Sequence, residues 1–243
     1  VRKYLKEYLE TKMGDYSEFT VRFKYQFMRL SKLISYVVFR LRDEFENSDF
    51  EPRAFELSIG NGENGESVKS QVINLSDGGT IQIRGSIDRV DTYTENGEQY
   101  VRVVDYKSGT KKFKLSDILY GLNLQMFVYL FTLCKSDNEL AGKEAGVLYL
   151  HSARSIYNVS RNSLYNEVSD GDDKSYKMLG VVLNDDEQQI AEHMEHDLKG
   201  RFIDAKAYAK GGVGGSIVSL EDMGRISHKI DSLIEQMGIN LHM

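Results

Sequence analysis

The sequence predicts an α/β fold in which a mixed central sheet, a β-meander plus one later strand, is flanked by helices. Apolar residues recur at helical spacing near both ends of the chain, as on helices that cover a sheet. Between these parts, alternating apolar and polar residues separated by turn signals indicate short strands. A helical stretch and a further strand follow the meander, and this order is typical of one α/β unit.

The length favours a single domain. We expect one domain over 1–243, with a core at 54–150, a helical lead at 1–46 and C-terminal helices at 184–240. The first residue is Val1 and not Met, so we expect an excised piece of a longer chain. No run approaches the roughly 18 apolar residues of a membrane span, and no signal segment opens the chain. We therefore expect a cytoplasmic location and no membrane partner.

Two helices are predicted in the lead. Residues 1–12 carry apolar side chains at the i, i+3, i+4, i+7 positions of an amphipathic helix. Residues 19–46 form the longest helical pattern, one apolar stripe with Arg and Lys between its members. Pro52, the only proline, closes this helical region.

Strand signals dominate the next part of the chain. Asp-Gly-Gly at 77–79 and Asn-Gly at 96–97 are typical of tight turns between paired strands. The last of these strands is rich in valine and has few polar gaps, so we expect it at the centre of the sheet. The predicted strands of the meander are 54–59, 71–75, 80–92 and 99–106.

The second half of the chain is predicted to return to helices. The segment 158–177 is polar and is expected to be an exposed excursion. His193 and His196, with Glu195 nearby, are expected on a solvated helix face. The remaining predicted elements are a helix at 116–134 capped by Ser116, a buried strand at 145–150, a helix to about 210 opened by Asn184 and Glu187, a glycine break at 211–215, and a last helix starting at Ser219.

Composition narrows the functional classes. The formal net charge of −6 argues against a protein that coats nucleic acid, which is usually basic. It does not argue against a nuclease, because a metal site needs local carboxylates. The single cysteine, Cys134, excludes an internal disulfide and a multi-cysteine metal site. The densest cationic stretch holds Lys107, Lys111, Lys112 and Lys114, which form either a solvated loop or a local DNA contact.

One constellation points to chemistry. Asp105 and Lys107 are two apart in a strand-like run, so both side chains lie on one face, and Asp88 ends the preceding alternation. Two carboxylates at adjacent strand ends can hold Mg²⁺ or Mn²⁺, which phosphodiester hydrolysis uses to activate water and neutralise charge. Lys107 would then lie near the attacking water or the scissile phosphate. The alternative is a surface ion pair between Lys107 and Asp105.

Other residues extend this candidate site. Gln125 and Tyr129 are one helical turn apart, so they share a face and either reach toward Lys107 and a DNA phosphate or satisfy hydrogen bonds in the core. Gly85 permits close approach of a backbone or ligand to the strand of Asp88. The further candidates are Arg89, which directly follows Asp88, Glu56, which could point toward the site from its strand, and the neighbouring Lys111 and Lys112.

Three ordered motifs resemble a known family. They are GSIDRVD at 85–91, VVDYKSG at 103–109 and YGLNLQMFVYL at 120–130, which contains a QxxxY element. Together they resemble the RecB-type branch of the PD-(D/E)XK nucleases. The resemblance implies a restriction-endonuclease-like core. It also implies that Asp88 and Asp105 are metal ligands, that Lys107 is the catalytic lysine, and that Gln125 and Tyr129 are an accessory pair.

The resemblance carries further expectations. It implies the exonuclease domain of a helicase–nuclease complex that resects double-strand DNA ends for recombination repair, cutting the unwound 5′-to-3′ strand. The partners would be DNA and a helicase–nuclease subunit of the AddA type. ATP binding is not expected in this chain, because it has no GxxxxGK[ST] loop.

The chain also departs from the family pattern. The histidine ligand that often precedes the sheet is missing, because His151 is the first histidine. An iron–sulfur cluster is expected in the parent protein, but its cysteines are absent from this chain. The isolated piece could therefore be inactive. Two alternatives stay open: a catalytically incomplete module that binds or guides DNA and docks the helicase subunit, and another member of the superfamily, such as a CRISPR-associated or stand-alone exonuclease.

Overall fold

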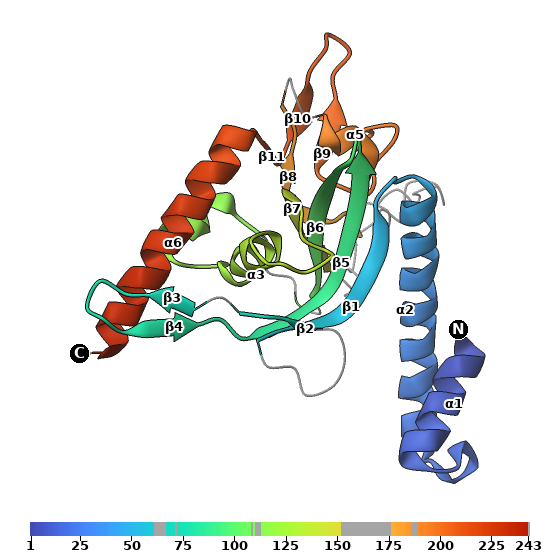
Figure 1. Ribbon diagram of the computed structural model, residues 1–243. Helices are drawn as coiled ribbons and strands as arrows, with labels where there is room; N and C mark the ends of the chain where they lie inside the picture. The colour runs from blue at the N-terminus through green and yellow to red at the C-terminus, as the bar shows by residue number, and fades with distance from the viewer. Residues whose placement is uncertain are drawn as a thin grey trace.

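A mixed seven-stranded sheet forms the centre of the protein, as seen in the computed structural model (Figure 1). Its strand order is β11-β8-β7-β6-β5-β1-β2, with helices on both sides, so the predicted α/β architecture is confirmed. Within the described ranges no helix combines the length and apolar character of a membrane span. The structure describes residues 1–60, 67–70, 72–107, 109, 113–151, 176–185 and 189–242.

Three antiparallel strands and one parallel strand make the middle of the sheet. β1 (Glu51–Ile59) pairs with β5 (Gly85–Glu95), which pairs with β6 (Glu98–Lys107). β7 (Lys143–His151) then lies parallel to β6 after a helical crossover. The valine-rich β6 has neighbours on both sides, as predicted. Pro52 lies in β1 beside a register shift, where the ladder tolerates a missing N–H.

Short strands close the sheet at both edges. β8 (Leu179–Leu183) pairs antiparallel with β7, and β11 (Ile217–Val218) pairs parallel with β8. At the other edge, β2 (Ser67–Val68) pairs parallel with β1. Edge strands this short offer few unpaired backbone groups to another chain. The patterns of β8 and β11 did not lead us to expect strands.

The predicted lead helices are confirmed. α1 (Arg2–Met13) and α2 (Val21–Glu46) are joined by the 3₁₀ turn η1 (Tyr16–Glu18). The Thr20 hydroxyl accepts a hydrogen bond from the Phe23 N–H and so caps α2. The buried residues of α2 include Ser31, Arg40 and Glu44, while Leu30 is half exposed.

The last predicted helix is also confirmed. α6 (Leu220–His242) begins after Ser219, whose hydroxyl accepts from the Asp222 N–H at 3.1 Å. The predicted long strand at 80–92, by contrast, is wrong. It divides into β4 (Thr80–Gln82) and β5, and β3 (Val72–Asn74) pairs with β4 in a separate hairpin. This hairpin lies against α6, where Gly238 leaves room for the side chains of Leu75 and Ile81 (Figure 1).

The predicted continuous helix at 116–134 is wrong as well. It consists of the 3₁₀ helix η2 (Leu115–Tyr120) and α3 (Gln125–Cys134). Between these two helices, Gly121 has a φ of 77° and Asn123 a φ of 57°. Residues of a right-handed α-helix have negative φ, so the helix cannot continue through this segment. Ser116 lies inside η2 and not at the start of α3, which begins at Gln125 with Leu124 at its N-cap.

The region after β8 also differs from the prediction. Only α5 (Ile190–Met194) is helical among the described residues of 184–210, and the glycine break forms a hairpin of β9 (Ala205–Ala207) and β10 (Val213–Gly215). The Asn184 side chain accepts from the Ala191 N–H. Glu187 lies outside the described residues, as does most of the predicted excursion at 158–177.

Glu195 explains why the long helix does not form. The prediction of a solvated face is wrong for this residue, which is 2% exposed. Its carboxylate accepts hydrogen bonds from four backbone N–H groups in the turn that follows, those of Lys199, Arg201, Phe202 and Ile203. These bonds stabilise a turn where the helix would otherwise continue.

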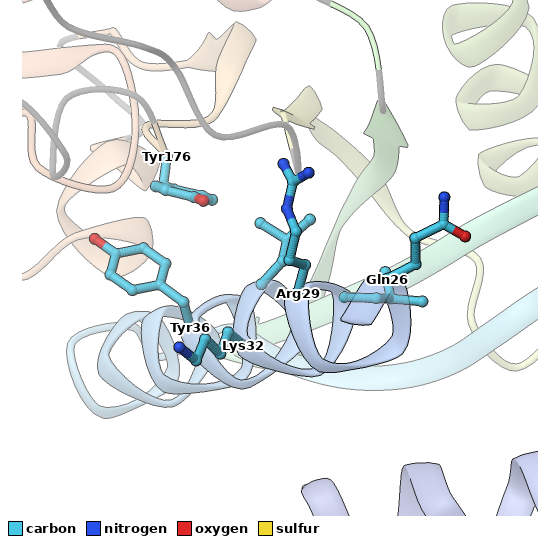
Figure 2. A pocket seen from close by; sticks show the side chains of 7 residues that line it. Gln26, Arg29, Lys32, Tyr36 and Tyr176 are labelled. Carbon is cyan, nitrogen blue, oxygen red and sulfur yellow. The ribbon is translucent and has the colours of Figure 1, made fainter. Parts of the chain in front are cut away.

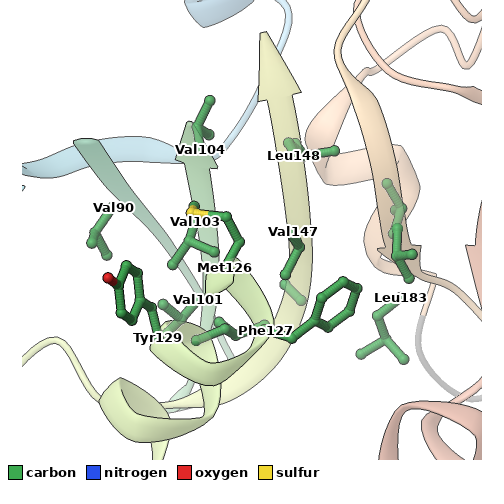
Figure 3. Packing of buried hydrophobic residues seen from close by; sticks show 14 of the residues in the cluster. Val90, Val101, Val103, Val104, Met126, Phe127, Tyr129, Val147, Leu148 and Leu183 are labelled. Carbon is green, nitrogen blue, oxygen red and sulfur yellow. The ribbon is translucent and has the colours of Figure 1, made fainter. Parts of the chain in front are cut away.

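A large part of the core lies between the sheet and α3. Val101 and Val103 of β6 pack with Val147 of β7 against Met126 and Phe127 (Figure 3). Because side chains alternate along β6, the residues at 101, 103, 105 and 107 share this face. The α3 face of the sheet is therefore apolar along most of its length and becomes polar where β6 ends.

Candidate active site

The two predicted aspartates lie where β5 and β6 separate. The pairing of these strands ends with Arg89 opposite Val104, and Asp88 and Asp105 are the next residues on each strand. They follow the alternation of Val90 and Val103, so both belong to the α3 face. The Asp88 Oδ2 atom accepts a hydrogen bond from the Tyr106 N–H at 2.8 Å, which links the two strands beyond their ladder.

Asp105 and Lys107 form an ion pair. The Lys107 Nζ lies 2.6 Å from Asp105 Oδ2, and the lysine side chain is 45% exposed against 10% for the aspartate. Asp105 Oδ2 is buried and accepts no hydrogen bond from a residue that the structure describes, so its contact with Lys107 is electrostatic. The lysine also lies 5.9 Å above the ring of Tyr149, which pairs with Asp105 in the parallel ladder.

Tyr149 lies beside Asp105 on the neighbouring strand. Burial, with the nearby Asp105 charge, raises the pKa of the Tyr149 hydroxyl well above its ordinary range. The tyrosine therefore stays neutral and forms an apolar wall. A carboxylate held against such a wall is weakly solvated, which strengthens its attraction for a cation.

Gln125 and Tyr129 lie on the same side of α3. The Gln125 Nε2 donates a hydrogen bond to the Tyr129 hydroxyl at 3.1 Å. An ideal Cβ built at Gly85 would overlap this hydroxyl, so the close approach predicted for Gly85 is made by Tyr129. Through this contact the pair lies against the start of β5, three residues before Asp88.

The donor set suits a hard divalent cation in part. Asp88 and Asp105 offer carboxylate oxygens, and Asp105 Oδ2 is buried with no hydrogen bond from the described part of the chain. Among the residues that the structure describes, no group of three or more His, Cys, Asp or Glu side chains is placed to hold a metal. Mg²⁺ often uses one or two carboxylates together with water and substrate phosphates, so two aspartates fit it.

The iron–sulfur cluster of the resemblance does not fit this chain. Cys134 is a free cysteine at the end of α3. Burial raises the pKa of its thiol, which keeps it protonated. One thiol cannot ligate such a cluster, which requires several thiolates.

The structure places Arg89 away from the two aspartates. It points to the opposite face of the sheet and is fully buried, with its Nη2 2.9 Å from Glu44 Oε1 and 2.8 Å from Asp91 Oδ2. Arg102 contacts the same two carboxylates, at 2.5 and 2.8 Å. Burial lowers the pKa of Arg89, but the charges of Asp91 and Glu44 outweigh burial and raise it overall. We call Glu44, Arg89, Asp91 and Arg102 the buried quartet; it joins α2 to the sheet.

Glu56 is not gathered with the two aspartates. Glu56 is exposed and has a left-handed φ of 51°, and within the described ranges it forms no metal-binding group with the aspartates. Its neighbours Phe55 and Leu57 pair with Arg89 and Ile87, so it lies at the level of Asp88 along β5. Lys111 and Lys112 lie outside the described residues.

Comparison with known proteins identifies the family. A family model described as the PD-(D/E)XK nuclease superfamily matches residues 2–212. The chain belongs to this superfamily. The PD-(D/E)XK prediction made from the three ordered motifs is thereby confirmed, and a mixed sheet flanked by helices is consistent with that fold.

The PD-(D/E)XK domain is similar to part of much longer bacterial proteins. It is 33% identical over 212 residues, 85% of this chain and 18% of the relative, to an ATP-dependent helicase/deoxyribonuclease subunit of Clostridium novyi. It is 38% identical over 167 residues to the protein of the same name in Clostridium kluyveri, covering 68% of this chain and 14% of the relative. These subunits are known as AddB, whose C-terminal nuclease domain the motifs resemble in order and spacing. The chain thus spans about a fifth or less of these relatives.

Sequence reasoning missed two contributors to the site. Tyr149 joins it through the parallel pairing of β7 with β6, which sets Tyr149 opposite Asp105. The Tyr106 N–H, which holds Asp88, is a backbone group and leaves no signal in a residue pattern. The polar end of an otherwise apolar face was the signal available, and it did predict Asp88, Asp105 and Lys107 together.

Proposed function

We propose that this chain is a metal-dependent deoxyribonuclease domain that hydrolyses phosphodiesters at Asp88, Asp105 and Lys107. The observation that carries the proposal is the Lys107 ammonium 2.6 Å from the Asp105 carboxylate, at the strand end that Asp88 also reaches. An amine and two acids at one strand end match what phosphodiester hydrolysis requires. Membership of a nuclease superfamily supports this assignment.

Asp88 and Asp105 would hold the divalent cation, Mg²⁺ or Mn²⁺. When bound, such an ion neutralises charge on the phosphate and lowers the pKa of a bound water. The Tyr106 N–H fixes one oxygen of Asp88, and the wall formed by Tyr149 limits hydration of Asp105. Both effects hold the carboxylates in place before a substrate arrives.

Lys107 would orient the attacking water and stabilise negative charge on the scissile phosphate. Its side chain is half exposed, so it can move from Asp105 to a phosphate that enters the site. Gln125 and Tyr129 would act as an accessory pair, because their hydrogen bond fixes the face of α3 that borders the start of β5. They position the strand that carries Asp88.

The names of the relatives support a wider role. We propose that the domain acts as an exonuclease within a helicase–nuclease complex, with a helicase–nuclease subunit of the AddA type as partner. In that complex it would cut the unwound 5′-to-3′ strand during resection of DNA ends for recombination repair. We place this activity in the cytoplasm, because the proposed substrate is bacterial DNA.

The test is cleavage of labelled single-stranded DNA by this chain with Mg²⁺ or Mn²⁺, and with EDTA. Asp88→Asn, Asp105→Asn and Lys107→Met should each lower the rate by about a hundredfold or more. Lys143→Met is a matched control, since Lys143 forms a similar ion pair with Glu98 at the opposite end of the same strands. Unchanged cutting by Asp105→Asn would sink the proposal. DNA binding without cutting by the unmodified chain would favour the DNA-guiding module.

A further inference from the structure

All but the last turn of α2 is strongly cationic. Residues 21–42 contain six Arg or Lys and no Asp or Glu, in a chain whose net charge is −6. Three of the six are engaged elsewhere: Arg40 is buried over the ring of Phe202, Arg42 pairs with Glu46, and Lys24 donates to the Ser17 carbonyl oxygen. The other three are in the first half of the helix: Arg22, Arg29 and Lys32.

This half of α2 extends past the ends of the central strands. Glu44 near the helix end contacts Arg102, in the first half of β6. Arg40 and Val37, about one and two helical turns before Glu44, line a small cavity together with Glu44 and Leu150, the residue before the end of β7. The N-terminal half of α2 therefore lies toward the C-terminal ends of β6 and β7, where Lys107 pairs with His151. Eleven residues of helix separate positions 40 and 29, or about 16 Å.

A cavity of about 510 Å³ lies along this part of the helix. Gln26, Arg29 and Lys32 line it from successive turns of α2, and Tyr36 and Tyr176 line its other end (Figure 2). The two tyrosine rings are 4.7 Å apart. Tyr176 also lines the cavity that contains Leu150, so the two hollows adjoin. The lining residues that the structure describes include no acid.

The two cations of this cavity are available to a ligand. Arg29 and Lys32 are exposed, and neither forms an ion pair with an acid in the described part of the chain. The Arg29 guanidinium lies over the ring of Tyr25, 6.0 Å from its centroid. Exposed like charges on one helix face repel each other, so an anion between them would be bound favourably.

We propose that Gln26, Arg29, Lys32, Tyr36 and Tyr176, here named the α2 groove, bind single-stranded DNA and align it with the strand ends at Asp105 and Lys107. The cations would contact phosphates, and the partly exposed ring of Tyr36, backed by the buried Tyr176, would stack with a base. Only unpaired bases offer a free face for stacking, which favours a single strand over a duplex. This inference rests on the proposed function, because it assigns a DNA path to that site.

Binding is measured by anisotropy of a labelled oligothymidylate about 16 nucleotides long, with EDTA present so that no cutting occurs. The double substitution Arg29→Glu and Lys32→Glu should weaken binding at least about tenfold and reduce the salt slope by roughly 1.4, since each phosphate contact on a single strand contributes about 0.7. The control is Lys206→Glu with Lys210→Glu, the same charge change at exposed positions on the β9–β10 hairpin (Figure 1).

Equal losses in the two double variants would overturn the inference, as would failure of the unmodified chain to bind at low salt. Tyr36→Ala should weaken binding about fivefold while Tyr36→Phe retains it, because a phenyl ring still stacks. A duplex of equal length that binds as tightly as the single strand would contradict the stacking argument. If Arg29→Glu with Lys32→Glu abolishes binding of an acidic polypeptide but leaves DNA binding unchanged, the groove binds a protein and not DNA.

The two proposals fail separately. The binding assay contains no divalent cation, so it does not depend on cleavage. If the chain binds DNA through the α2 groove but does not cut DNA in the cleavage assay, only the catalytic proposal is contradicted. If DNA cleavage depends on Asp105 but DNA binding is unchanged by Arg29→Glu with Lys32→Glu, only the proposal for the α2 groove is contradicted. Circular dichroism of each variant shows that the helix is retained.

Discussion

The Tyr129 hydroxyl occupies the space that a side chain at residue 85 would need. An ideal Cβ at Gly85 would lie closer than 3.0 Å to three atoms of the Tyr129 ring and hydroxyl. Tyr129 is 7% exposed and accepts a hydrogen bond from Gln125. The glycine of the first motif and the tyrosine of the third are thus one contact between β5 and α3, next to the strand of Asp88.

Gly85→Ala should lower the free energy of unfolding by about 1–3 kcal/mol, because the methyl group forces a buried ring to move. Urea denaturation measures this loss. Combining it with Tyr129→Leu should recover part of the stability, since the shorter side chain removes the clash. Gly224→Ala is the control: it lies on α6 with open space around its Cβ, and alanine there should be neutral or stabilising. Strict additivity of the first two changes would contradict the contact.

The buried quartet should make Glu44 necessary for folding. Its carboxylate is the acceptor for both Arg89 and Arg102, all with side chains at most 4% exposed. Glu44→Ala leaves two buried cations with Asp91 alone, which should cost about 3–5 kcal/mol. Glu46→Ala, which breaks an exposed pair with Arg42 on the same helix, should change stability by less than about 1 kcal/mol. Similar effects of the two substitutions would argue that the quartet does not secure α2.

Asp49 should make stability fall in acid. Burial raises the pKa of Asp49, but hydrogen bonds from His193 and His196, at 2.7 and 2.8 Å, outweigh burial and lower it below 3.8. A lowered pKa adds stability above the ordinary value, and this stability is lost as the pH falls through the lowered pKa. Tyr93, which stacks on His193, and Glu95, 3.8 Å from it, are the other groups that face this cluster.

The free energy of unfolding, measured from about pH 5 to pH 2, should therefore decrease less in Asp49→Asn than in the unmodified chain. The variant should also be less stable at pH 5, where the carboxylate is charged. Asp137→Asn, at an exposed position outside the cluster, serves as the matched control. An unchanged pH slope in Asp49→Asn would show that the two histidines do not stabilise the carboxylate.

Glu56 should carry backbone strain. Its φ of 51° lies in the left-handed region, where a side chain costs of order 1 kcal/mol. Glu56→Gly should raise the free energy of unfolding by about 0.5–1 kcal/mol, because glycine adopts this backbone freely. Glu56→Ala keeps the Cβ and should bring no such gain. If both variants gain equally, removal of the carboxylate and not relief of strain is the cause.

The elements that residue patterns placed correctly are those whose pattern depends on local spacing. The apolar stripes of α1, α2 and α6, the valines of β6 and the tight turn at Asn96 and Gly97 were all predicted from neighbours in sequence. The errors occurred where distant contacts overrule local preference. A helix after Asn184 was expected, but the buried Glu195 carboxylate binds the backbone of the following turn instead.

For the candidate site, residue type and a period of two were enough to select Asp88, Asp105 and Lys107, because strand geometry places alternate side chains on one face. Which strands are neighbours could not be read in this way. The parallel pairing of β6 with β7 brings Tyr149 beside Asp105, and the crossing of α2 over the other face buries Arg89. Both depend on contacts between residues more than forty positions apart, which no local pattern encodes.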